Sequence, residues 1–254
     1  MSNHPSPYVL RFTFYVVSAM HNSQPRIVVL IPALNEEVAL PYVLADLPRG
    51  AVEEVVVVDN GSSDRTAEVA RASGATVLSE PRRGYGSACL AGIAYLRTKA
   101  PDIVVFLDAD YSDHPEELPA VVQPIVTEGY DLVIGSRTKG EADPGALLPQ
   151  SRCGNALATV LIRLLYGFTY SDLGPFRAIR FATLLGLGMT DCTYGWTVEM
   201  QIKAVRQGLR IAEVPVRYRK RVGGESKVSG TVKGSLLAGY KILWTVFRYV
   251  RRSV

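Results

Sequence analysis

The chain has 254 residues, and 48% of them are hydrophobic, which is enough to build a sizeable buried core. Its formal net charge is only +4 at pH 7, which is too even for the dense basic face of a nucleic-acid-binding protein, so we expect no nucleic-acid partner. Its three cysteines include no CxxC pair, which indicates neither a disulfide framework nor a zinc site and favours a reducing, cytoplasmic compartment.

The first 25 residues are expected to form an extension outside the main domain. They include the apolar stretch YVLRFTFYVVSAM (8–20), which has 13 residues and contains Arg11, so it is too short to span a bilayer. This stretch could be poorly ordered, or it could form an edge strand or a surface anchor. We expect the main domain over residues 26–230 and an amphipathic C-terminal helix over residues 231–254.

From Arg26 onward, short runs rich in Val and Ile alternate with stretches of helical periodicity. This alternation predicts an α/β domain with a mostly parallel central sheet that is covered by helices on both faces. In a sheet of this kind, ligands bind beyond the carboxyl ends of the strands. The first five predicted strands lie in RIVVLIP (26–32), EEVVVVDNGSSD (53–64), ATVLSE (75–80), DIVVFLDAD (102–110) and DLVIGSR (131–137).

The second half of the chain is less regular. Residues 136–150 carry Gly, Pro and charge without periodicity and predict a long loop, which is usually functional when it lies inside a compact domain. The pattern then predicts helices near residues 151–166 and 196–207, a strand in RIAEVPVRY (210–218), a Gly-rich basic loop and a final helix from about residue 231.

Acids, amides and glycines gather where four of the predicted strands end, in PALNEE (32–37), DNGSSD (59–64), DADYSD (108–113) and GSR (135–137). Asp59, directly at a strand end, favours a functional role, whereas Asp64 favours a helix-capping role. No glycine fingerprint follows the first strand, so a dinucleotide cofactor is not indicated. The glycines of RGYGSACLAG (83–92) instead predict a tight helix start and close packing.

Asp108 and Asp110 are separated by one residue in an extended segment, so both carboxylates can face one site. Without neutralisation they would repel each other, and the pKa of one carboxyl would rise. A divalent cation removes this conflict, and oxygen ligands suit Mg²⁺ or Mn²⁺, which usually accompany a diphosphate. The alternative is that one aspartate caps the helix beginning near Pro115 and the other is solvated.

Together these motifs resemble those of the family 2 glycosyltransferases of the GT-A fold, and within that family the dolichol- or polyprenyl-phosphate hexose (mannose or glucose) synthases. The resemblance runs from about Arg26 to Lys233, through IPALNEE, VVDNGSSDRT, FLDADYSDHPEEL, DLVIGSR, FRAIR, VEMQIKA and GESK. It implies a GT-A fold and a metal-dependent, inverting transfer of a hexose. The implied donor is a nucleoside-diphosphate sugar of the GDP-mannose or UDP-glucose type, and the implied acceptor is a polyprenyl or dolichyl phosphate.

The resemblance also implies roles for single residues. Asp108 and Asp110 would contact the ribose and the metal, with Asp110 as the principal metal ligand. Acceptor phosphate contacts would come from Arg137 and Arg152. The nucleotide pocket would be lined by Pro32, Ala33, Asn35, Glu36, Asp59 and Gly61, and a mobile loop closing over the donor diphosphate would contain Arg221, Ser226 and Lys227. Two departures are Ser112, where many bacterial relatives have glutamine, and SDLGPFRAIR (171–180), which replaces a commoner Ser/Thr-Gly-Phe variant.

The acceptor decides whether a catalytic base is needed. A lipid phosphate is already ionised at neutral pH, whereas a hydroxyl would require a carboxylate within hydrogen-bond reach of its proton. Glu199 in YGWTVEMQIKA is the candidate base, and its alternative role is that of a structural acid near a helix start. We therefore keep two further hypotheses, transfer to a hydroxyl of another lipid or soluble acceptor and, less favoured, a non-catalytic nucleotide-sugar binder.

The final helix combines apolar and basic stripes. One stripe contains Leu236, Leu243, Phe247 and Val250, and the other contains Lys241, Arg248 and Arg252. Such a helix can lie on an anionic membrane surface and so meet a lipid acceptor. It can equally pack on its own domain or contact a membrane-protein partner. We expect a cytoplasmic enzyme, peripheral on the inner face of the membrane if the helix binds lipid.

Overall fold

A computed structural model describes residues 24–223 and 232–250, and for residues 232–238 only the backbone. The predictions made for the N-terminal extension before residue 24, and for Ser226 and Lys227, lie outside the described residues. No helix in the described ranges is long and apolar enough to cross a membrane.

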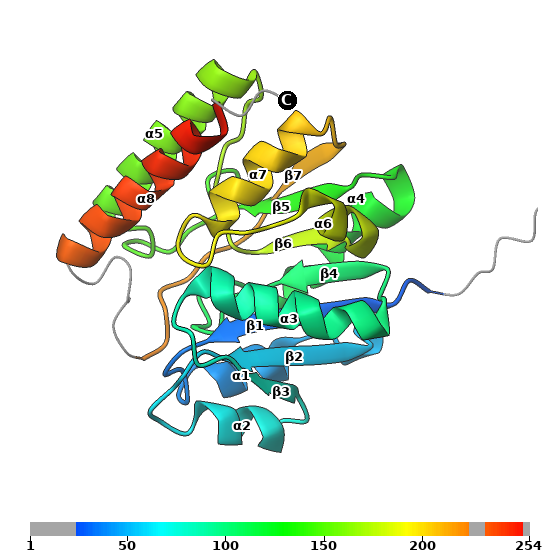
Figure 1. Ribbon diagram of the computed structural model, residues 1–254. Helices are drawn as coiled ribbons and strands as arrows, with labels where there is room; N and C mark the ends of the chain where they lie inside the picture. The colour runs from blue at the N-terminus through cyan, green and yellow to red at the C-terminus, as the bar shows by residue number, and fades with distance from the viewer. Residues whose placement is uncertain (1–23, 224–231, 251–254) are drawn as a thin grey trace, which may run out of the picture.

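The described residues build a seven-stranded sheet with the strand order β3-β2-β1-β4-β6-β5-β7 (Figure 1). Strands β1 to β4 pair in parallel, as do β5 and β7, while β6 runs antiparallel between β4 and β5. The predicted mostly parallel sheet is therefore confirmed. The strands are β1 (Ile27–Ala33), β2 (Glu54–Asp59), β3 (Thr76–Ser79), β4 (Ile103–Phe106), β5 (Leu132–Ser136), β6 (Arg177–Arg180) and β7 (Ile211–Pro215).

Helices cover both faces of the sheet because successive side chains of each strand point to opposite sides. In β1, Val28 and Leu30 pack with α3, α6 and α7, whereas Val29 and Ile31 pack with α1, α2 and α4. The α-helices are α1 (Leu40–Asp46), α2 (Thr66–Ala72), α3 (Tyr85–Lys99), α4 (Leu118–Glu128), α5 (Pro149–Tyr166), α6 (Phe181–Leu187), α7 (Trp196–Arg206) and α8 (Val232–Val250), and short 3₁₀ turns span Arg49–Ala51 and Pro115–Glu117.

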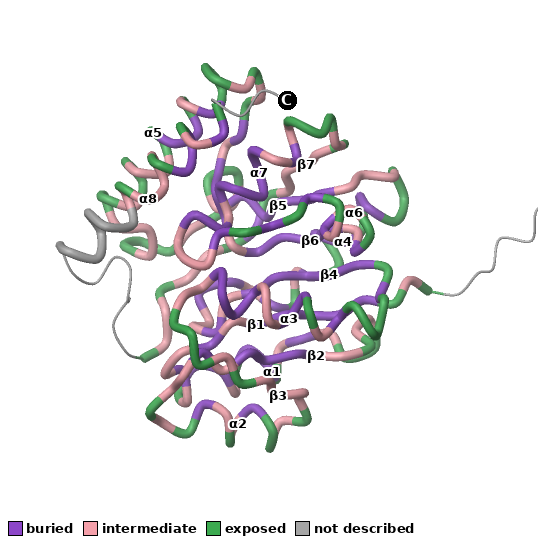
Figure 2. The backbone as a smooth tube through the Cα atoms, in the orientation of Figure 1, coloured by how far each residue is buried: buried purple, intermediate pink, exposed green. Residues whose placement is uncertain are grey.

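Helices α5 and α8 lie side by side and form an outer layer over α7 (Figure 1). Ala158 and Ile162 of α5 and Val246 and Tyr249 of α8 are buried in the same core cluster as α7. Strands and inner helices are mostly buried, while the outer surfaces of α5 and α8 contain exposed stretches (Figure 2). The C-terminal helix therefore packs on its own domain through one face, which was one of the three roles considered for it.

Strand β6 was not predicted as a strand, although its sequence FRAIR was noted as a motif. It has only four residues and begins and ends with arginine, so it has no hydrophobic alternation to identify it. Arg177 is nevertheless buried, because its guanidinium donates to the carbonyl oxygens of Leu173 and Gly174. Backbone acceptors thus stabilise a charged side chain at a position where the sequence pattern predicts exposure.

Candidate active site

A cavity of about 1260 Å³ opens at the carboxyl ends of β1, β4 and β5, as expected for a sheet of this type. Its wall begins with Pro32 and Ala33 at the end of β1 and continues with Asp108 and Asp110 after β4. Arg137, directly after β5, lies farther along the wall. The cavity is also lined by the first turns of α5 and the middle of α8, including Ser151 and Ile242.

The two predicted metal-binding acids lie together in this wall. Burial, and then the charge of Asp110, raise the pKa of Asp108 to about 7, which a hydrogen bond from Tyr85 only partly offsets. Asp110 Oδ1 accepts from the backbone N–H and the hydroxyl of Ser112, at 3.0 and 2.6 Å. Asp108 Oδ1 is buried and has no hydrogen-bond partner among the described residues. An unpartnered oxygen beside a second carboxylate fits a divalent cation that needs only one or two protein ligands.

Asp113 is a third acid beside this pair, and sequence analysis did not single it out. It is 1% exposed, and neither of its carboxylate oxygens has a hydrogen-bond partner among the described residues. Burial, and then the charges of Asp108 and Asp110, raise its pKa well above the usual range. Burial and the neighbouring carboxylates thus favour the protonated form of Asp113, so Asp108 and Asp110 are the two candidate ligands in the cavity wall.

Arg221 lines the same cavity beside the acid pair, in the part that is expected to hold the donor. Its Nη2 atom lies 2.7 and 3.0 Å from the two carboxylate oxygens of Glu36, and its Nη1 atom lies 3.9 Å from Asp110 Oδ2. Val222, the next residue, donates its backbone N–H to the carbonyl oxygen of Asp110. Residues from the first and the last thirds of the chain thus meet around the acid pair.

The loops after β1 and β2 are connected by their own polar groups. Asn35 has a positive φ of 54°, and its side-chain oxygen accepts from the backbone N–H of Ser63 at 2.7 Å. Asp59 accepts from the backbone N–H of Ser62 at 3.0 Å. Asn35, Asp59 and Gly61 are not part of the cavity wall, where Glu36 and Asn60 stand instead. The predicted nucleotide residues thus divide into wall residues and residues that shape the turns behind the wall.

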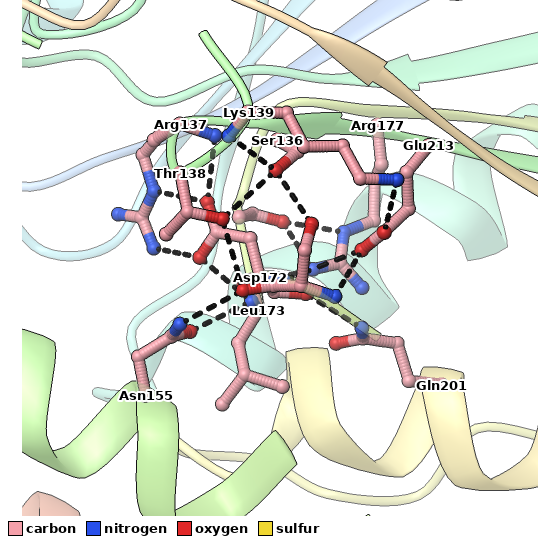
Figure 3. Close-up of polar contacts among 12 residues, drawn as sticks. Ser136, Arg137, Thr138, Lys139, Asn155, Asp172, Leu173, Arg177, Gln201 and Glu213 are labelled. Carbon is pink, nitrogen blue, oxygen red and sulfur yellow. Dashed lines mark hydrogen bonds and ion pairs between the residues drawn. The ribbon is translucent and has the colours of Figure 1, made fainter. Parts of the chain in front are cut away.

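Arg137 is held by Asp172, from the SDLGPF segment (Figure 3). Its Nε and Nη2 atoms contact the two carboxylate oxygens at 2.8 and 2.7 Å, and its backbone N–H donates to the same group. Burial alone would lower the pKa of Arg137, but the contacts with Asp172 raise it, so the guanidinium stays charged. Asp172 was not predicted as a site residue, because nothing local in the sequence pairs it with a residue 35 positions away.

Arg152 lies on the exposed side of α5 rather than in the main cavity wall. It lines a smaller cavity of about 450 Å³, together with Arg137, Ser151 and Asn155. Arg137 lines both cavities, so the smaller cavity is where the two arginines predicted to contact an acceptor phosphate are found together. Asn155 fixes this region by accepting from the backbone N–H of Leu173 at 2.8 Å.

Glu199 is not positioned to act as a base. Its side chain is fully buried, and the cavity wall does not include it. Tyr249 donates to it at 2.5 Å, Lys203 pairs with it at 2.8 Å, and the backbone N–H groups of Thr190 and Asp191 donate to it. Burial alone would raise the pKa of Glu199, but the hydrogen bonds from Lys203 and Tyr249 lower it to about 2. The structural alternative for Glu199 therefore fits, because a saturated carboxylate cannot reach a substrate proton.

The segment held by Glu199 is part of the cavity wall, since Thr193 and Tyr194 line the cavity. It packs against the start of α3, where Gly84 has a φ of 140° and Ser87 donates its N–H to the carbonyl of Cys192. A Cβ atom at Gly86 would overlap the carbonyl oxygen of Asp191. These contacts agree with the tight helix start and close packing predicted for the RGYGSACLAG segment.

Comparison with known proteins identifies the family. A model described as glycosyl transferase family 2 matches residues 28–185, which is more than half of the chain. The chain belongs to glycosyl transferase family 2. It is therefore a glycosyltransferase, as the sequence motifs predicted.

Several relatives are similar over most of their length. An uncharacterized glycosyltransferase of Mycobacterium tuberculosis is 40% identical over 213 residues, which are 84% of this chain and 94% of that protein. A dolichyl-phosphate hexose transferase of Haloferax volcanii is 38% identical over 215 residues, 82% of this chain and 89% of that protein. An undecaprenyl-phosphate mannosyltransferase of Micrococcus luteus is 36% identical over 225 residues, with 82% and 90% covered.

Solved structures of glucosyl-3-phosphoglycerate synthase from Mycobacterium tuberculosis show the same fold. The complex with Mn²⁺, uridine-diphosphate-glucose and phosphoglyceric acid has a TM-score of 0.70 and 27% identity, covering 89% of this chain and 80% of that chain. The same synthase has also been solved with Mg²⁺ and uridine diphosphate. The predicted GT-A fold of this family 2 glycosyltransferase is thereby confirmed.

Proposed function

We propose that this family 2 glycosyltransferase moves a hexose from a nucleoside-diphosphate sugar to a polyprenyl or dolichyl phosphate, with inversion and with the help of Mg²⁺ or Mn²⁺. The observation that carries the proposal is the pair of Asp108 and Asp110 in the cavity wall, with Asp108 Oδ1 unpartnered among the described residues and Asp110 paired with Arg221, in a cavity that Arg137 also lines. Relatives that use dolichyl or undecaprenyl phosphate support the acceptor class. Solved neighbours that contain Mn²⁺ or Mg²⁺ with uridine diphosphate support the donor class and the metal.

The residues present fit a divalent cation. Asp108 Oδ1 has no hydrogen-bond partner among the described residues. Asp110 Oδ2 lies 3.9 Å from the guanidinium of Arg221. A cation held between these oxygens would neutralise the charge that accumulates on the leaving diphosphate. In the cation-bound state Asp108 is deprotonated, because its oxygen acts as a ligand.

Arg221 is proposed to bind the departing diphosphate. In the structure its guanidinium already lies within 4 Å of both Glu36 and Asp110, so it neutralises two acids of the donor end. An arginine presents several N–H donors in a planar fork that matches phosphate oxygens. Moving from Glu36 to the diphosphate would let it stabilise negative charge as the bond to the sugar breaks. The role of the following loop, with Ser226 and Lys227, remains a prediction.

The acceptor end needs positive charge and no base. Arg137 stays charged through its contact with Asp172, and Arg152 lies next to it on α5. A phosphate between these groups would be bound as an anion whose oxygen is already a nucleophile. The position of Glu199 outside the cavity agrees with this reaction. The acids of the cavity wall in the described residues are Glu36, Asp108 and Asp110, all at the donor end.

A second candidate is transfer to the hydroxyl of a different lipid or of a small soluble acceptor. It is favoured by the solved neighbours that contain phosphoglyceric acid, which carries both a hydroxyl and a phosphate. In that case Arg137 and Arg152 would bind the phosphate of the acceptor, and one of the three cavity acids would have to accept the hydroxyl proton. A nucleotide-sugar donor implies a cytoplasmic active site in both cases.

Radiolabelled transfer distinguishes these candidates. We expect label from UDP-glucose or GDP-mannose to enter an organic-extractable, mild-acid-labile product when undecaprenyl phosphate and Mn²⁺ are present. In the same reaction with phosphoglyceric acid, all label should stay in the unreacted nucleotide sugar when the aqueous phase is separated by anion-exchange chromatography. If label entered only a product of phosphoglyceric acid, the acceptor would be a soluble molecule and not a lipid phosphate.

A further inference from the structure

Large apolar side chains remain exposed on the outer layer of the protein. Among the described residues, eleven large hydrophobic side chains are exposed, and eight of them belong to α5 and α8. Leu157, Val160 and Leu164 recur every three or four residues on α5, so they share one side of that helix. On α8 the same spacing relates Tyr240, Trp244 and Phe247, with exposures of 66%, 41% and 52%. Because α5 and α8 pack against each other, we group these side chains as the α5/α8 face, and large exposed apolar areas are typical of interaction surfaces.

The charge of the two helices indicates what this face can contact. Residues 149–166 contain two arginines, and residues 232–254 contain five lysines or arginines, but neither segment contains an aspartate or glutamate. Lys241 is paired with the buried Asp191 at 3.2 Å, so its charge is already matched. Arg163 is exposed, and Arg248 stacks on Trp244 with 5.0 Å between the guanidinium carbon and the ring centroid. Apolar and aromatic side chains among unpaired arginines are typical of surfaces that bind anionic lipids.

A second copy of the chain is a poorer match for the same face. In a symmetric dimer this face would meet itself, and the basic side chains of one copy would lie opposite those of the other. Like charges placed opposite each other across an interface are unfavourable. A bilayer that contains acidic headgroups supplies both the apolar depth and the opposite charge.

The two helices that form the α5/α8 face also line the cavity, so contact with a bilayer could bring an acceptor to the site. The first turns of α5 line the cavity through Gln150, Ser151 and Gly154, and the middle of α8 lines it through Gly239 and Ile242. The apolar side chains continue along the same two helices beyond these positions. An acceptor phosphate at headgroup level could thus enter the cavity while its hydrocarbon chain stays in the bilayer.

We propose that the α5/α8 face docks on an anionic lipid bilayer, and that docking turns the acceptor end of the cavity toward the headgroups. The second part rests on the proposed lipid-phosphate acceptor, whereas the first part stands on the surface alone. Tyr240, Trp244 and Phe247 insert at the interface, and Arg163 and Arg248 contact the headgroup phosphates.

Vesicle co-sedimentation of the full chain, without nucleotide sugar or polyprenyl phosphate, tests the docking. We expect binding to pure phosphatidylglycerol vesicles, and much weaker binding to pure phosphatidylcholine vesicles. Combining Val160→Glu with Phe247→Glu should reduce binding to phosphatidylglycerol at least about tenfold, because two apolar contacts are lost and two negative charges are added. The matched control is Val126→Glu on α4, since Val126 and Val160 are 50% and 52% exposed. The control should bind as the unchanged protein does.

Three results would overturn the proposal: equal binding to both lipids, unchanged binding by the double variant, or equal loss in the Val126→Glu control. A dimer in light scattering that the double variant converts to a monomer, with no vesicle binding by either protein, would assign the face to a second copy. Thermal shifts with UDP or GDP and Mn²⁺ should be the same in all variants, which shows that the donor end is intact. If vesicle binding holds but no transfer to a lipid phosphate is found, the docking stands and only the proposed acceptor falls.

Discussion

Replacing Glu199 with glutamine tests whether this residue stabilises the acceptor wall or acts as a base. The carboxylate is fully buried, and hydrogen bonds from Lys203 and Tyr249 lower its pKa from the ordinary 4.5 to about 2. A difference of this size corresponds to at most about 3 kcal/mol of folding free energy at neutral pH. For a domain of this length, that loss would lower the melting temperature by roughly 6–12 °C.

The direction of the pKa shift predicts how the stabilisation by Glu199 changes with pH. Because the pKa of Glu199 is lower in the folded chain than in the unfolded chain, its stabilisation is fully present above about pH 4.5. It is lost as the pH falls from 4.5 toward 2. The difference in melting temperature between the unchanged protein and Glu199→Gln should therefore be largest at neutral pH and should shrink below pH 4.5.

Scanning calorimetry over this pH range, with Glu68→Gln as control, is the assay. Glu68 also lies in the first turn of its helix but is exposed, so its replacement removes only the interaction of the charge with the helix dipole. We expect a shift of no more than about 1 kcal/mol in the control. Transfer activity of Glu199→Gln, measured well below its melting temperature, should be reduced but present. A variant as stable as the unchanged protein and without any activity would refute the structural role and restore Glu199 as the base.

Three further changes probe other parts of the site. Asp110→Asn should abolish both transfer and the thermal shift caused by Mn²⁺ with UDP or GDP, and full activity in this variant would contradict the metal assignment. Gly86→Ala should destabilise the fold by more than about 2 kcal/mol, because the added methyl group meets the Asp191 carbonyl. The control Gly186→Ala should be neutral or slightly stabilising, because a methyl group there meets nothing within 4 Å. Equal melting temperatures of the two variants would contradict this packing. Asp172→Asn should cost up to about 3 kcal/mol, because it removes the buried carboxylate charge that pairs with the partly buried Arg137, and urea unfolding that shows less than about 1 kcal/mol would argue against that pairing.

Local signals in the sequence predicted that Asp108 and Asp110 lie together at the carboxyl edge of the sheet. Asp108 and Asp110 follow a buried Val-rich strand, and the order of the strands then places them at the edge where ligands bind. The sequence did not predict which distant residues contact each other around the site. Arg221 contacts Glu36 across 185 positions, and Tyr249 contacts Glu199 across 50. No periodicity or motif links such residues, because only the folded topology brings them together.

The same limit explains the two weaker parts of the prediction. Strand β6 is short, carries arginine at both ends and is held by neighbours on both sides, so tertiary pairing rather than local pattern makes it a strand. Glu199 has the residue type and helix position of a base, but its carboxylate is already bound by Lys203 and by Tyr249 from α8. A single sequence contains both Glu199 and Tyr249 but does not show that they are in contact.

The most direct test of the account is anomalous scattering from crystals soaked with Mn²⁺ and UDP or GDP. The account predicts a manganese peak between the carboxylates of Asp108 and Asp110, in contact with the diphosphate, with the Arg221 side chain turned from Glu36 toward the phosphates. A manganese peak elsewhere, with a nucleotide bound away from this acid pair, would contradict it.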